Sequence, residues 1–386
     1  MPEENMQCFK TLEDLKNSYG ERIHQIAHER KSGKKLVGTF CLFVPDEIIF
    51  AAGADRVILC GGKNDTVSIA EQYLPRNICP LVKSSFGSII NDGCSGIKSC
   101  SHFSMVDMIV AENTCDSKKK MYELLEDYVP TYVIDLPQRP DTPEAFKYFL
   151  SELEKFRDAM EQLTGNKVTT EGLRQEIKSS NEIRQLFHRL YELRKRDPSP
   201  ISGADVLKIL QKQQFLSPDK LKEYLQMLIN EVGIIGSEQV HKPRIMISGC
   251  PMPGGSTKVT EIIESKGGVI VAEESCTGTR SFWDLVDENK EPMIALAERY
   301  IKIPCSCMSP NDRRIDNILE LAREFRIDGV IYYTLQFCHG YNIEKQKVQK
   351  ALKEAGIPML SIETDYSDSD IEQIGLRVDA FMEMIS

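Results

Sequence analysis

The segment that decides the fold spans residues 327–345 and reads IDGVIYYTLQFCHGYNIEK. Within it, residues 330–335 form a run of mostly apolar side chains, which is typical of a strand buried on both faces of a parallel sheet. The run ends in a polar loop, QFCHG, that leads into a helix. In an open α/β sheet, ligands bind beyond the carboxyl ends of the strands, so Cys338 in this loop is a candidate site residue.

Cysteines follow other strand-like runs at the same relative position. The runs are LVGTF, DRVIL, MVDMIVAENT, RIMISG, GGVIVAEES and the shorter RYIKIP, and they are followed by Cys41, Cys60, Cys115, Cys250, Cys276 and Cys305. Because parallel strands end at one edge of a sheet, we expect these thiols to lie in loops at that edge, where thiolates can bind a metal. The alternative is that most of them are small buried hydrophobic residues.

The cysteine spacing excludes the compact metal-binding motifs. The chain has 12 cysteines but no CxxC pair and no ferredoxin-type run, and its one CxC is formed by Cys305 and Cys307. Any metal ligands must therefore come from distant loops. A disulfide framework is not expected, because a chain of this size does not need one and cytosolic thiols stay reduced.

Composition narrows the class of protein. The chain has 386 residues, which favours two domains and an additional segment. Its formal net charge is −10 and it has no basic cluster interleaved with aromatic residues, so nucleic acid is not an expected partner. No apolar run is long enough to span a membrane, and the acidic, polar N-terminus is not a secretory signal. We expect a cytoplasmic protein.

The order of the expected elements indicates an α/β fold with two doubly wound parallel-sheet domains and a helical connecting segment. Residues 1–143 form the N-terminal α/β domain, which opens with an amphipathic helix over residues 11–31. Residues 144–233 form the helical segment, which begins with Thr142 as N-cap and Pro143 at the first helical position. Residues 234–386 form the C-terminal α/β domain, which ends in a helix over residues 371–385.

Two polar residues near the cysteines are candidates for proton transfer. His339 follows Cys338, and Glu47 lies in the helix after Cys41. A solvent-facing histidine and an ordinary carboxylate at a helix N-terminus are the alternatives. The sequence PGGSTK at residues 253–258 lacks the order of a P-loop, so it predicts a tight turn more readily than an anion site.

Four blocks of the sequence resemble the subunits of 2-hydroxyacyl-CoA dehydratases and benzoyl-CoA reductases. They are TFCLFVPDEIIFAAGA, NICPLVKSSFG, IYYTLQFCHGYNIEK and LSIETDYSDSDIEQIGLRVDAFMEM, and together they extend over nearly the whole chain. The resemblance implies two α/β domains and a [4Fe–4S] cluster held by three cysteines, which match Cys41, Cys79 and Cys338. It also implies an ATP-hydrolysing activator protein that supplies low-potential electrons.

Further cysteines at Cys115, Cys276 and Cys305 depart from the dehydratase pattern, and each is expected in a loop after a strand. In this respect the chain resembles the double-cubane cluster proteins within the family, in which one sulfide bridges two cubanes and each cubane keeps three cysteine ligands. The resemblance implies Cys41, Cys79 and Cys338 for one cubane and Cys115, Cys276 and Cys305 for the other. Cys307 is an alternative to Cys305, and the remaining candidates are Cys60, Cys94, Cys100 and Cys250.

The expected function is therefore an iron–sulfur reductase component that acts on small, hard-to-reduce molecules. The chain has no nucleotide-binding motif, so the ATPase is expected to be a separate activator, and the chain itself a homodimer. The first alternative is a 2-hydroxyacyl-CoA dehydratase or benzoyl-CoA reductase subunit with a single [4Fe–4S] cluster. The second is a non-catalytic electron carrier or zinc-binding protein.

Overall fold

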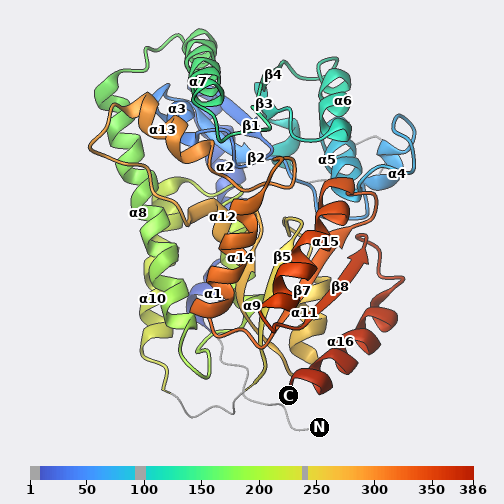
Figure 1. Cartoon of the computed structure of the whole chain (residues 1–386). Helices are drawn as coiled ribbons and strands as arrows, with labels where there is room; N and C mark the ends of the chain where they lie inside the picture. Colours follow the sequence, from blue (N-terminus) through green and yellow to red (C-terminus); the bar gives the residue numbers. More distant parts are fainter. Residues whose placement is uncertain (1–8, 92–100, 237–241) are drawn as a thin grey trace.

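Two parallel four-stranded sheets organise the chain in the computed structural model, which describes residues 9–91, 101–236 and 242–386 (Figure 1). The strands of the first sheet are ordered β2-β1-β3-β4, and those of the second β6-β5-β7-β8. Their bounds are β1 Leu36–Thr39, β2 Asp55–Ile58, β3 Met108–Glu112, β4 Thr131–Ile134, β5 Arg244–Gly249, β6 Val269–Glu274, β7 Gly329–Leu335 and β8 Met359–Thr364. All neighbouring strands pair in parallel, which confirms the doubly wound α/β fold.

Helices connect the strands and cover the sheets. Around the first sheet they are α1 Lys10–Asp14, α2 Ser18–Lys31, α3 Asp46–Ala51, α4 Val67–Ala70, α5 Pro80–Ile90, the 3-10 helix Ser101–Ser104 and α6 Asp116–Leu125. Between the sheets in sequence lie α7 Pro143–Thr164, α8 Thr170–Arg194, α9 Gly203–Lys212 and α10 Pro218–Gly233. The second half contains α11 Lys258–Ser265, α12 Thr279–Phe282, α13 Pro292–Tyr300, α14 Asp312–Glu324, α15 His339–Glu354 and α16 Ile371–Ile385.

The long helices α8 and α10 lie along one side of the molecule (Figure 1). Phe187 and Leu190 of α8 belong to the same buried apolar cluster as Ile245 of β5 and Val57 of β2. In the second cluster Phe149 of α7 lies with residues of α13, although α13 follows β6 in the chain. Helices of the connecting segment therefore pack into the same apolar clusters as the strands of both sheets, and α13 packs with α7. The domain limits at residues 143 and 233 stay predictions.

Helix ends follow from local chemistry at several predicted positions. The Thr142 and Ser202 side chains accept hydrogen bonds from the backbone N–H groups of Ala145 and Asp205, as N-cap residues do. The final helix, α16, has the predicted bounds. In the part of the chain that the structure describes, none of the helices has the length and apolar character needed to cross a membrane.

Two local predictions are wrong. The expected helix over residues 11–31 is divided into α1 and α2, and at the break the Ser18 hydroxyl donates to the Leu15 carbonyl. No strand directly precedes Cys305, which lies in a described loop between α13 and α14, where Asn311 Nδ2 donates to the Cys305 carbonyl. The run before Cys305 begins inside α13, and the N–H groups of Ile303 and Cys305 then donate to the Tyr300 and Ile303 carbonyls, so the segment forms turns instead of a strand. Pro304, between them, has no N–H group to donate.

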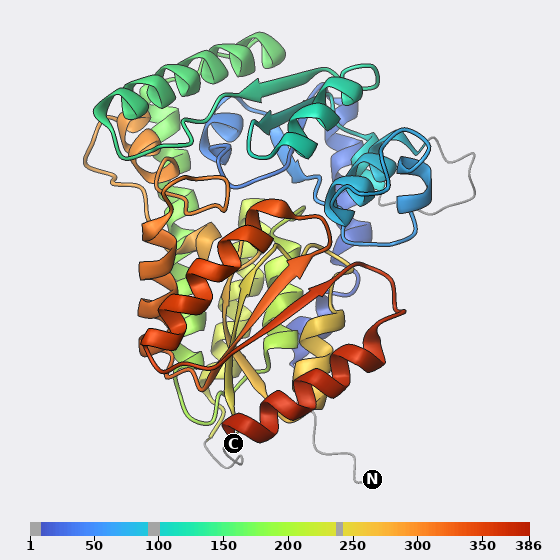
Figure 2. The same ribbon diagram turned by 45° about the vertical axis from the view of Figure 1, so that its right-hand side comes forward.

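The carboxyl ends of the second sheet face the first half of the molecule. In Figure 2 the arrowheads of β7 and β8 point towards the part that holds β1–β4. In each sheet the connections reverse direction at the central pair, which is β1 and β3 in one and β5 and β7 in the other. Ligands of doubly wound proteins bind beyond such central pairs, so the region between the two sheets is the place to look for a site.

Candidate functional site

Thiols from both halves meet in this region. Cys41 and Cys60, which follow β1 and β2, line a small cavity of about 40 Å³ together with Cys276, which follows β6. Cys250 directly follows β5, and Cys338 begins α15 after β7. The prediction that the strands deliver cysteines to the carboxyl edges is therefore confirmed for these positions, and the edges of the two sheets lie opposite each other.

One group of thiols surrounds the turn between α13 and α14. The thiols of Cys305 and Cys307 are hydrogen-bonded to each other, which lowers the pKa of Cys305 and raises the pKa of Cys307. Burial raises the pKa of Cys276 and of Cys41, and the neighbouring charge of Cys305 acts on Cys276 in the same direction. Cys41 is close enough to Cys276 and Cys307 to interact with both electrostatically.

A second group lies at the start of two helices. Hydrogen bonding between Cys79 and Cys338 raises the pKa of Cys79, and a bond with Cys250 raises the pKa of Cys338. Cys79 is the N-cap of α5 and Cys338 the N-cap of α15. A helix N-terminus favours negative charge, which suits thiolates that bind a metal.

The backbone before Cys338 is strained. Phe337 has a φ angle of 59°, a left-handed conformation that residues other than glycine rarely adopt. Such strain costs about 1–3 kcal/mol and persists where the surrounding structure demands it, often at functional sites. Here it turns the chain from β7 into α15 and places Cys338 at the edge of the second sheet.

Cys115 is the predicted residue that lies furthest out. It is exposed as the N-cap of α6, and its thiol interacts electrostatically with Lys118, Cys79 and Cys305. The six predicted ligands therefore lie in one connected region, and Cys60, Cys250 and Cys307 lie there as well. All nine described cysteines are free thiols. Cys94 and Cys100 lie outside the described residues.

Two buried cations accompany the thiols. The Lys118 ammonium donates a 2.6 Å hydrogen bond to Cys41 Sγ and lies 3.9 Å from the Glu112 carboxylate. Arg280 Nη1 lies 4.0 Å from Cys276 Sγ, and its Nη2 donates to Glu274 at 2.8 Å. Positive charge at this distance favours the thiolate form of cysteine.

Sequence reasoning missed both cations. Lys118 comes three residues after Cys115, and Arg280 four residues after Cys276, so their positions in the cysteine loops were the available signal. Glu112 was also missed, although it ends β3 at the same edge. Burial raises the pKa of the Glu112 carboxyl to about 7.

Several buried hydroxyls near the thiols have no hydrogen-bond partner among the described residues. They belong to Thr114, Tyr122, Ser275 and Tyr366. Tyr122 interacts electrostatically with Cys41 and Cys115, and Tyr366 with Cys79 and Cys250. Buried polar groups are normally satisfied, so this concentration of unpartnered hydroxyls fits a bound group that contacts them.

The donor set fits an iron–sulfur cluster better than a single ion. Within residues 9–91, 101–236 and 242–386, no three His, Cys, Asp or Glu side chains form a group that could hold one metal ion. A cluster places its thiolate ligands on different irons, so they need not converge on one point, and thiolates suit iron–sulfur centres. The thiols and the two cations therefore suit a cluster with several metals.

The two candidates for proton transfer occupy different surroundings. Glu47 is fully buried and accepts hydrogen bonds from Arg184 and from Tyr300, each at 2.7 Å. Burial opposes the charge of Glu47, but Arg184 and Tyr300 outweigh it and lower its pKa. His339 is exposed at the first position of α15. Both roles stay predictions.

The sequence is similar to known proteins over nearly its whole length. A putative dehydratase subunit, YjiM, of Escherichia coli (strain K12) is 37% identical over 367 residues, which cover 92% of this chain and 93% of that protein. The beta subunit of (R)-phenyllactyl-CoA dehydratase of Clostridium sporogenes is 26% identical over 363 residues, covering 93% and 94%. One of the subunits of benzoyl-CoA reductase of Thauera aromatica is 25% identical over 371 residues, covering 92% of each protein.

The family model described as 2-hydroxyglutaryl-CoA dehydratase, D-component, matches residues 41–385. The match begins at Cys41 and includes all six predicted cysteines, both buried cations and every strand after β1. The chain therefore belongs to the 2-hydroxyglutaryl-CoA dehydratase D-component family.

Proposed function

We propose that this chain is the iron–sulfur component of an ATP-dependent reductase that acts on small, hard-to-reduce molecules. The observation that carries the proposal is the meeting of nine free thiols and two buried cations between the two sheets. A single cubane with three ligands would leave most of these thiols without a role. We propose a double-cubane [8Fe–9S] cluster with Cys41, Cys79 and Cys338 on one cubane and Cys115, Cys276 and Cys305 on the other.

The cluster would supply electrons at low potential when bound, and the residues around it would set its charge. Lys118 and Arg280 each place a positive charge beside one proposed ligand, Cys41 and Cys276. Hydrogen bonds and net charge set the potential of such centres. The thiols at the starts of α5 and α15 add helix N-termini that stabilise negative charge.

Two partners follow from this proposal. Energy is needed to reach a very low potential, and the loop at residues 253–258 is not a nucleotide-binding P-loop. We therefore propose a separate ATP-hydrolysing iron–sulfur activator as the electron donor. We also propose that the chain forms a homodimer, and that exposed His339 or another group near the thiols transfers protons.

A second candidate function is supported by a different pocket. A cavity of about 290 Å³ beside Cys60 is lined by Lys63 and Lys212 and by the rings of Phe103 and Phe215. Lysines and an apolar wall suit an acyl-CoA, and the names of two similar proteins include such substrates. In this case the chain would be a dehydratase or reductase subunit with a single [4Fe–4S] cluster and a different partner subunit.

Iron and acid-labile sulfide per chain, measured on anaerobically purified protein, separate the two candidates. We expect about eight irons and about nine sulfides per chain for the double cluster, and about four of each for a single cubane. Zinc in place of iron would contradict both. The variant Cys276→Ser is expected to lose about half of the iron if each cubane binds separately.

The matched control for this variant is Cys60→Ser. Cys60 lines the same cavity as Cys276, but its thiol donates a 2.8 Å hydrogen bond to the Phe40 carbonyl, which a serine hydroxyl can also make. We expect Cys60→Ser to keep the full iron content. Equal iron in Cys276→Ser and in the unmodified protein would exclude Cys276 as a ligand.

A further inference from the structure

The cavity of about 290 Å³ beside Cys60 lies between the loops that follow β2 and β5. Glycines of both loops line it and are in contact, since a Cβ on Gly62 would lie 2.9 Å from the Gly254 carbonyl oxygen. The end of α9 and the residues after it supply a further part of the lining. Segments from both halves of the chain therefore form the cavity, and its volume is at the lower end of the range of about 300–1,000 Å³ for ligand pockets.

Lys212 of α9 places an ammonium group in this lining without a counter-charge. Lys212 Nζ lies 5.2 Å from the centroid of the Phe215 ring, which lines the same cavity. Within residues 9–91, 101–236 and 242–386, Lys212 Nζ has no hydrogen-bond acceptor and no carboxylate partner, and burial alone lowers its pKa. Partial burial of an uncompensated charge costs free energy, which an anionic ligand would offset.

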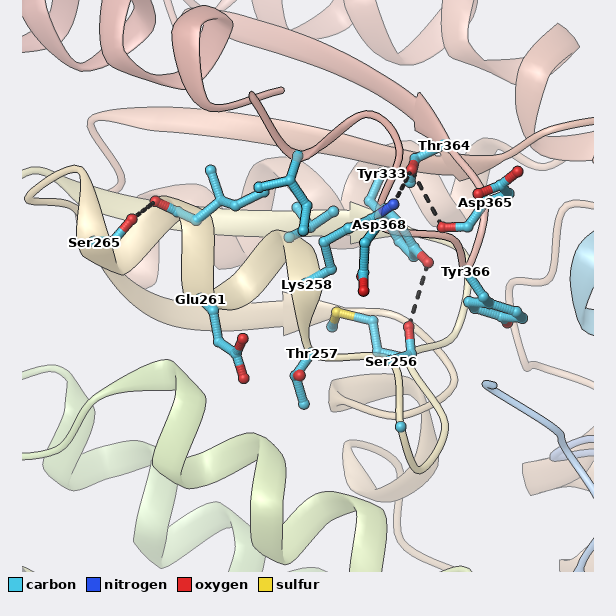
Figure 3. Close-up of a pocket in the computed structure, with 15 residues that line it drawn as sticks. Ser256, Thr257, Lys258, Glu261, Ser265, Tyr333, Thr364, Asp365, Tyr366 and Asp368 are labelled. Atoms are coloured by element: carbon cyan, nitrogen blue, oxygen red, sulfur yellow. Dashed lines mark hydrogen bonds between the residues drawn. The ribbon is translucent and has the colours of Figure 1, made fainter. Parts of the chain in front are cut away.

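The lysine of another pocket shows how such a group is normally satisfied. In the pocket at the carboxyl edge of the second sheet (Figure 3), Lys258 donates to Thr364 Oγ1 at 2.7 Å, to the Ser367 carbonyl at 2.6 Å and to Asp370 Oδ1 at 2.6 Å. An ammonium has three donors, so these bonds use all of them. By contrast, none of the described residues accepts a hydrogen bond from Lys212, and its donors are available to a ligand.

The rest of the lining suits an anion that has an apolar body. Phe103 and Phe215 contribute aromatic rings, which pack well against a planar apolar group. Lys63 is a second cation of the lining, and Asp65 is its carboxylate; both are exposed. His102 is uncharged at neutral pH, because burial lowers its pKa to about 4. The half-buried charge in the cavity is therefore the positive charge of Lys212.

The cavity adjoins the thiols. Cys60 and Gln214 line both this cavity and the small cavity that Cys41 and Cys276 line. Gln214 Oε1 accepts from the Gly254 N–H at 3.2 Å, while its Nε2 donates to none of the described residues. A molecule that fills the larger cavity would therefore contact Lys212 and lie next to the thiols at the same time.

We propose that this cavity binds a small carboxylate with a planar apolar body, and that the Lys212 ammonium binds the carboxylate while Phe103 and Phe215 contact the apolar part. The inference rests on the proposed reductase function and names the class of its substrate. The same lining supports the second candidate function, because a CoA ester also has negative groups and an apolar part. A cavity of this volume suits the small carboxylate better, since most of a CoA ester would lie outside it.

Three probes separate the contributions of charge and apolar body: benzoate, benzamide and acetate. Benzamide has the shape of benzoate without its charge, and acetate has the charge without the ring. Binding to the anaerobically purified protein is measured by saturation-transfer NMR. We expect benzoate to bind about tenfold more tightly than either of the other two. Equal binding of benzamide, or no binding of benzoate, would overturn the proposal.

Free coenzyme A distinguishes the two classes of ligand. We expect benzoate to bind at least as tightly as coenzyme A and to stay bound when equal concentrations of the two are present. Displacement of benzoate by a lower concentration of coenzyme A would assign the cavity to a CoA ester and overturn the proposal.

Two lysine variants locate the binding. Lys212→Met keeps the apolar stem beside Phe215 and removes the charge, so it should weaken benzoate binding about tenfold and leave benzamide binding unchanged. Lys208→Met is the matched control, because Lys208 lies one turn earlier on α9, pairs with Asp205 and does not line the cavity. Unchanged benzoate binding in Lys212→Met would place the probe elsewhere and refute this site.

The free energy of unfolding gives a second readout that needs no ligand. Because the charge of Lys212 is uncompensated, Lys212→Met should unfold at a higher denaturant concentration than the unmodified protein. Lys208→Met should unfold at nearly the same concentration as the unmodified protein, since exposed ion pairs contribute little. A lower midpoint for Lys212→Met would show that the ammonium stabilises the fold and would contradict its role as a free ligand group.

The iron content of each sample distinguishes failure of this inference from failure of the proposed function. If iron is present at about eight per chain and benzoate does not bind, the inference fails and the proposed function stands. If iron is absent and benzoate binds in a manner that depends on Lys212, the cavity stands as a ligand site and the reductase function fails. A change in the cluster's electron paramagnetic resonance spectrum on adding benzoate would support binding beside the thiols.

Discussion

Lys118 Nζ lies 2.6 Å from Cys41 Sγ, and the lysine side chain is only 8% exposed. Burial opposes the charge of the ammonium, but Cys41, Tyr122 and Glu112 outweigh it and raise the pKa of Lys118. The pair therefore places a buried ammonium against the sulfur of Cys41, whose own pKa burial raises. A buried positive charge at a ligand position is a direct means of making a cluster easier to reduce.

Lys118→Met should lower the reduction potential of the bound cluster. The variant keeps the length and apolar contacts of the side chain but removes the charge next to Cys41. Two unit charges about 4 Å apart interact by about 1–4 kcal/mol, depending on the effective dielectric constant, so we expect an effect of that order per electron. A redox titration followed by electron paramagnetic resonance measures it.

Lys119→Met is the matched control for this prediction. Lys119 is the next residue of the same helix, pairs with Asp116 at the surface and is 40% exposed. Its loss should leave the potential and the iron content unchanged. An equal shift in both variants would show that the effect is long-range and not due to the contact with Cys41.

Glu47→Gln should mainly destabilise the fold. The change leaves the Arg184 guanidinium buried beside a neutral amide, and breaking a buried ion pair typically costs about 3–5 kcal/mol. Chemical denaturation measures the loss. The role in proton transfer that the sequence suggested would instead lower turnover per iron and leave the free energy of unfolding unchanged.

Glu123→Gln serves as the comparison for Glu47. Glu123 pairs with Lys120 on the surface, where both side chains are more than half exposed. Such pairs contribute only about 0–1 kcal/mol. A loss of stability in Glu47→Gln no larger than in Glu123→Gln would contradict the structural role of Glu47.

Much of the fold could be predicted from the sequence because its strands are short apolar runs separated by clear helix starts. The start of α7 was predicted correctly from Thr142 and Pro143, and both ends of α16 were predicted correctly as well. The run before Cys305 led to a wrong prediction because Ile303 is buried like a strand residue, yet its N–H donates to the Tyr300 carbonyl in a turn. Apolar burial alone does not distinguish a strand from a buried loop.

The thiols could be predicted individually, but their surroundings could not. The sequence KKK at residues 118–120 offers three equivalent lysines, and only the packing of α6 against the first sheet turns Lys118 towards Cys41. Lys119 and Lys120 pair with surface carboxylates instead. Which side chain of a helix faces a site depends on how that helix packs against elements far away in the chain, and the local sequence does not show this.

Gly249→Ala should disturb the edge that carries Cys250. Gly249 has a φ angle of 138°, and a Cβ there would lie 2.0 Å from the Tyr333 carbonyl oxygen. The backbone strain alone costs about 1–3 kcal/mol, and the contact with β7 adds to it. We expect a lower midpoint of unfolding, measured by thermal denaturation.

Gly233→Ala is the control for this change. Gly233 ends α10, and a Cβ there would meet nothing within 4 Å. The variant should be as stable as the unmodified protein or slightly more stable. If Gly249→Ala behaves in the same way, the close approach of β5 and β7 does not hold Cys250 in place.

His102 should make the fold less stable as the pH falls. The side chain is 5% exposed, its Nδ1 lies 3.0 Å from Tyr19 Oη, and burial lowers its pKa to about 4. In the unfolded chain His102 gains a proton as the pH falls through about 6.5, whereas in the folded protein it gains one only near pH 4. The free energy of unfolding therefore decreases as the pH falls from about 6.5 towards 4. Between pH 7 and pH 5 the loss due to His102 should be about 2 kcal/mol.

Chemical denaturation of the unmodified protein and of His102→Gln at both pH values isolates this difference, which should be absent in the variant. The variant His24→Gln, at an exposed position of α2, should keep the full pH dependence, and its loss there would show that another group is responsible.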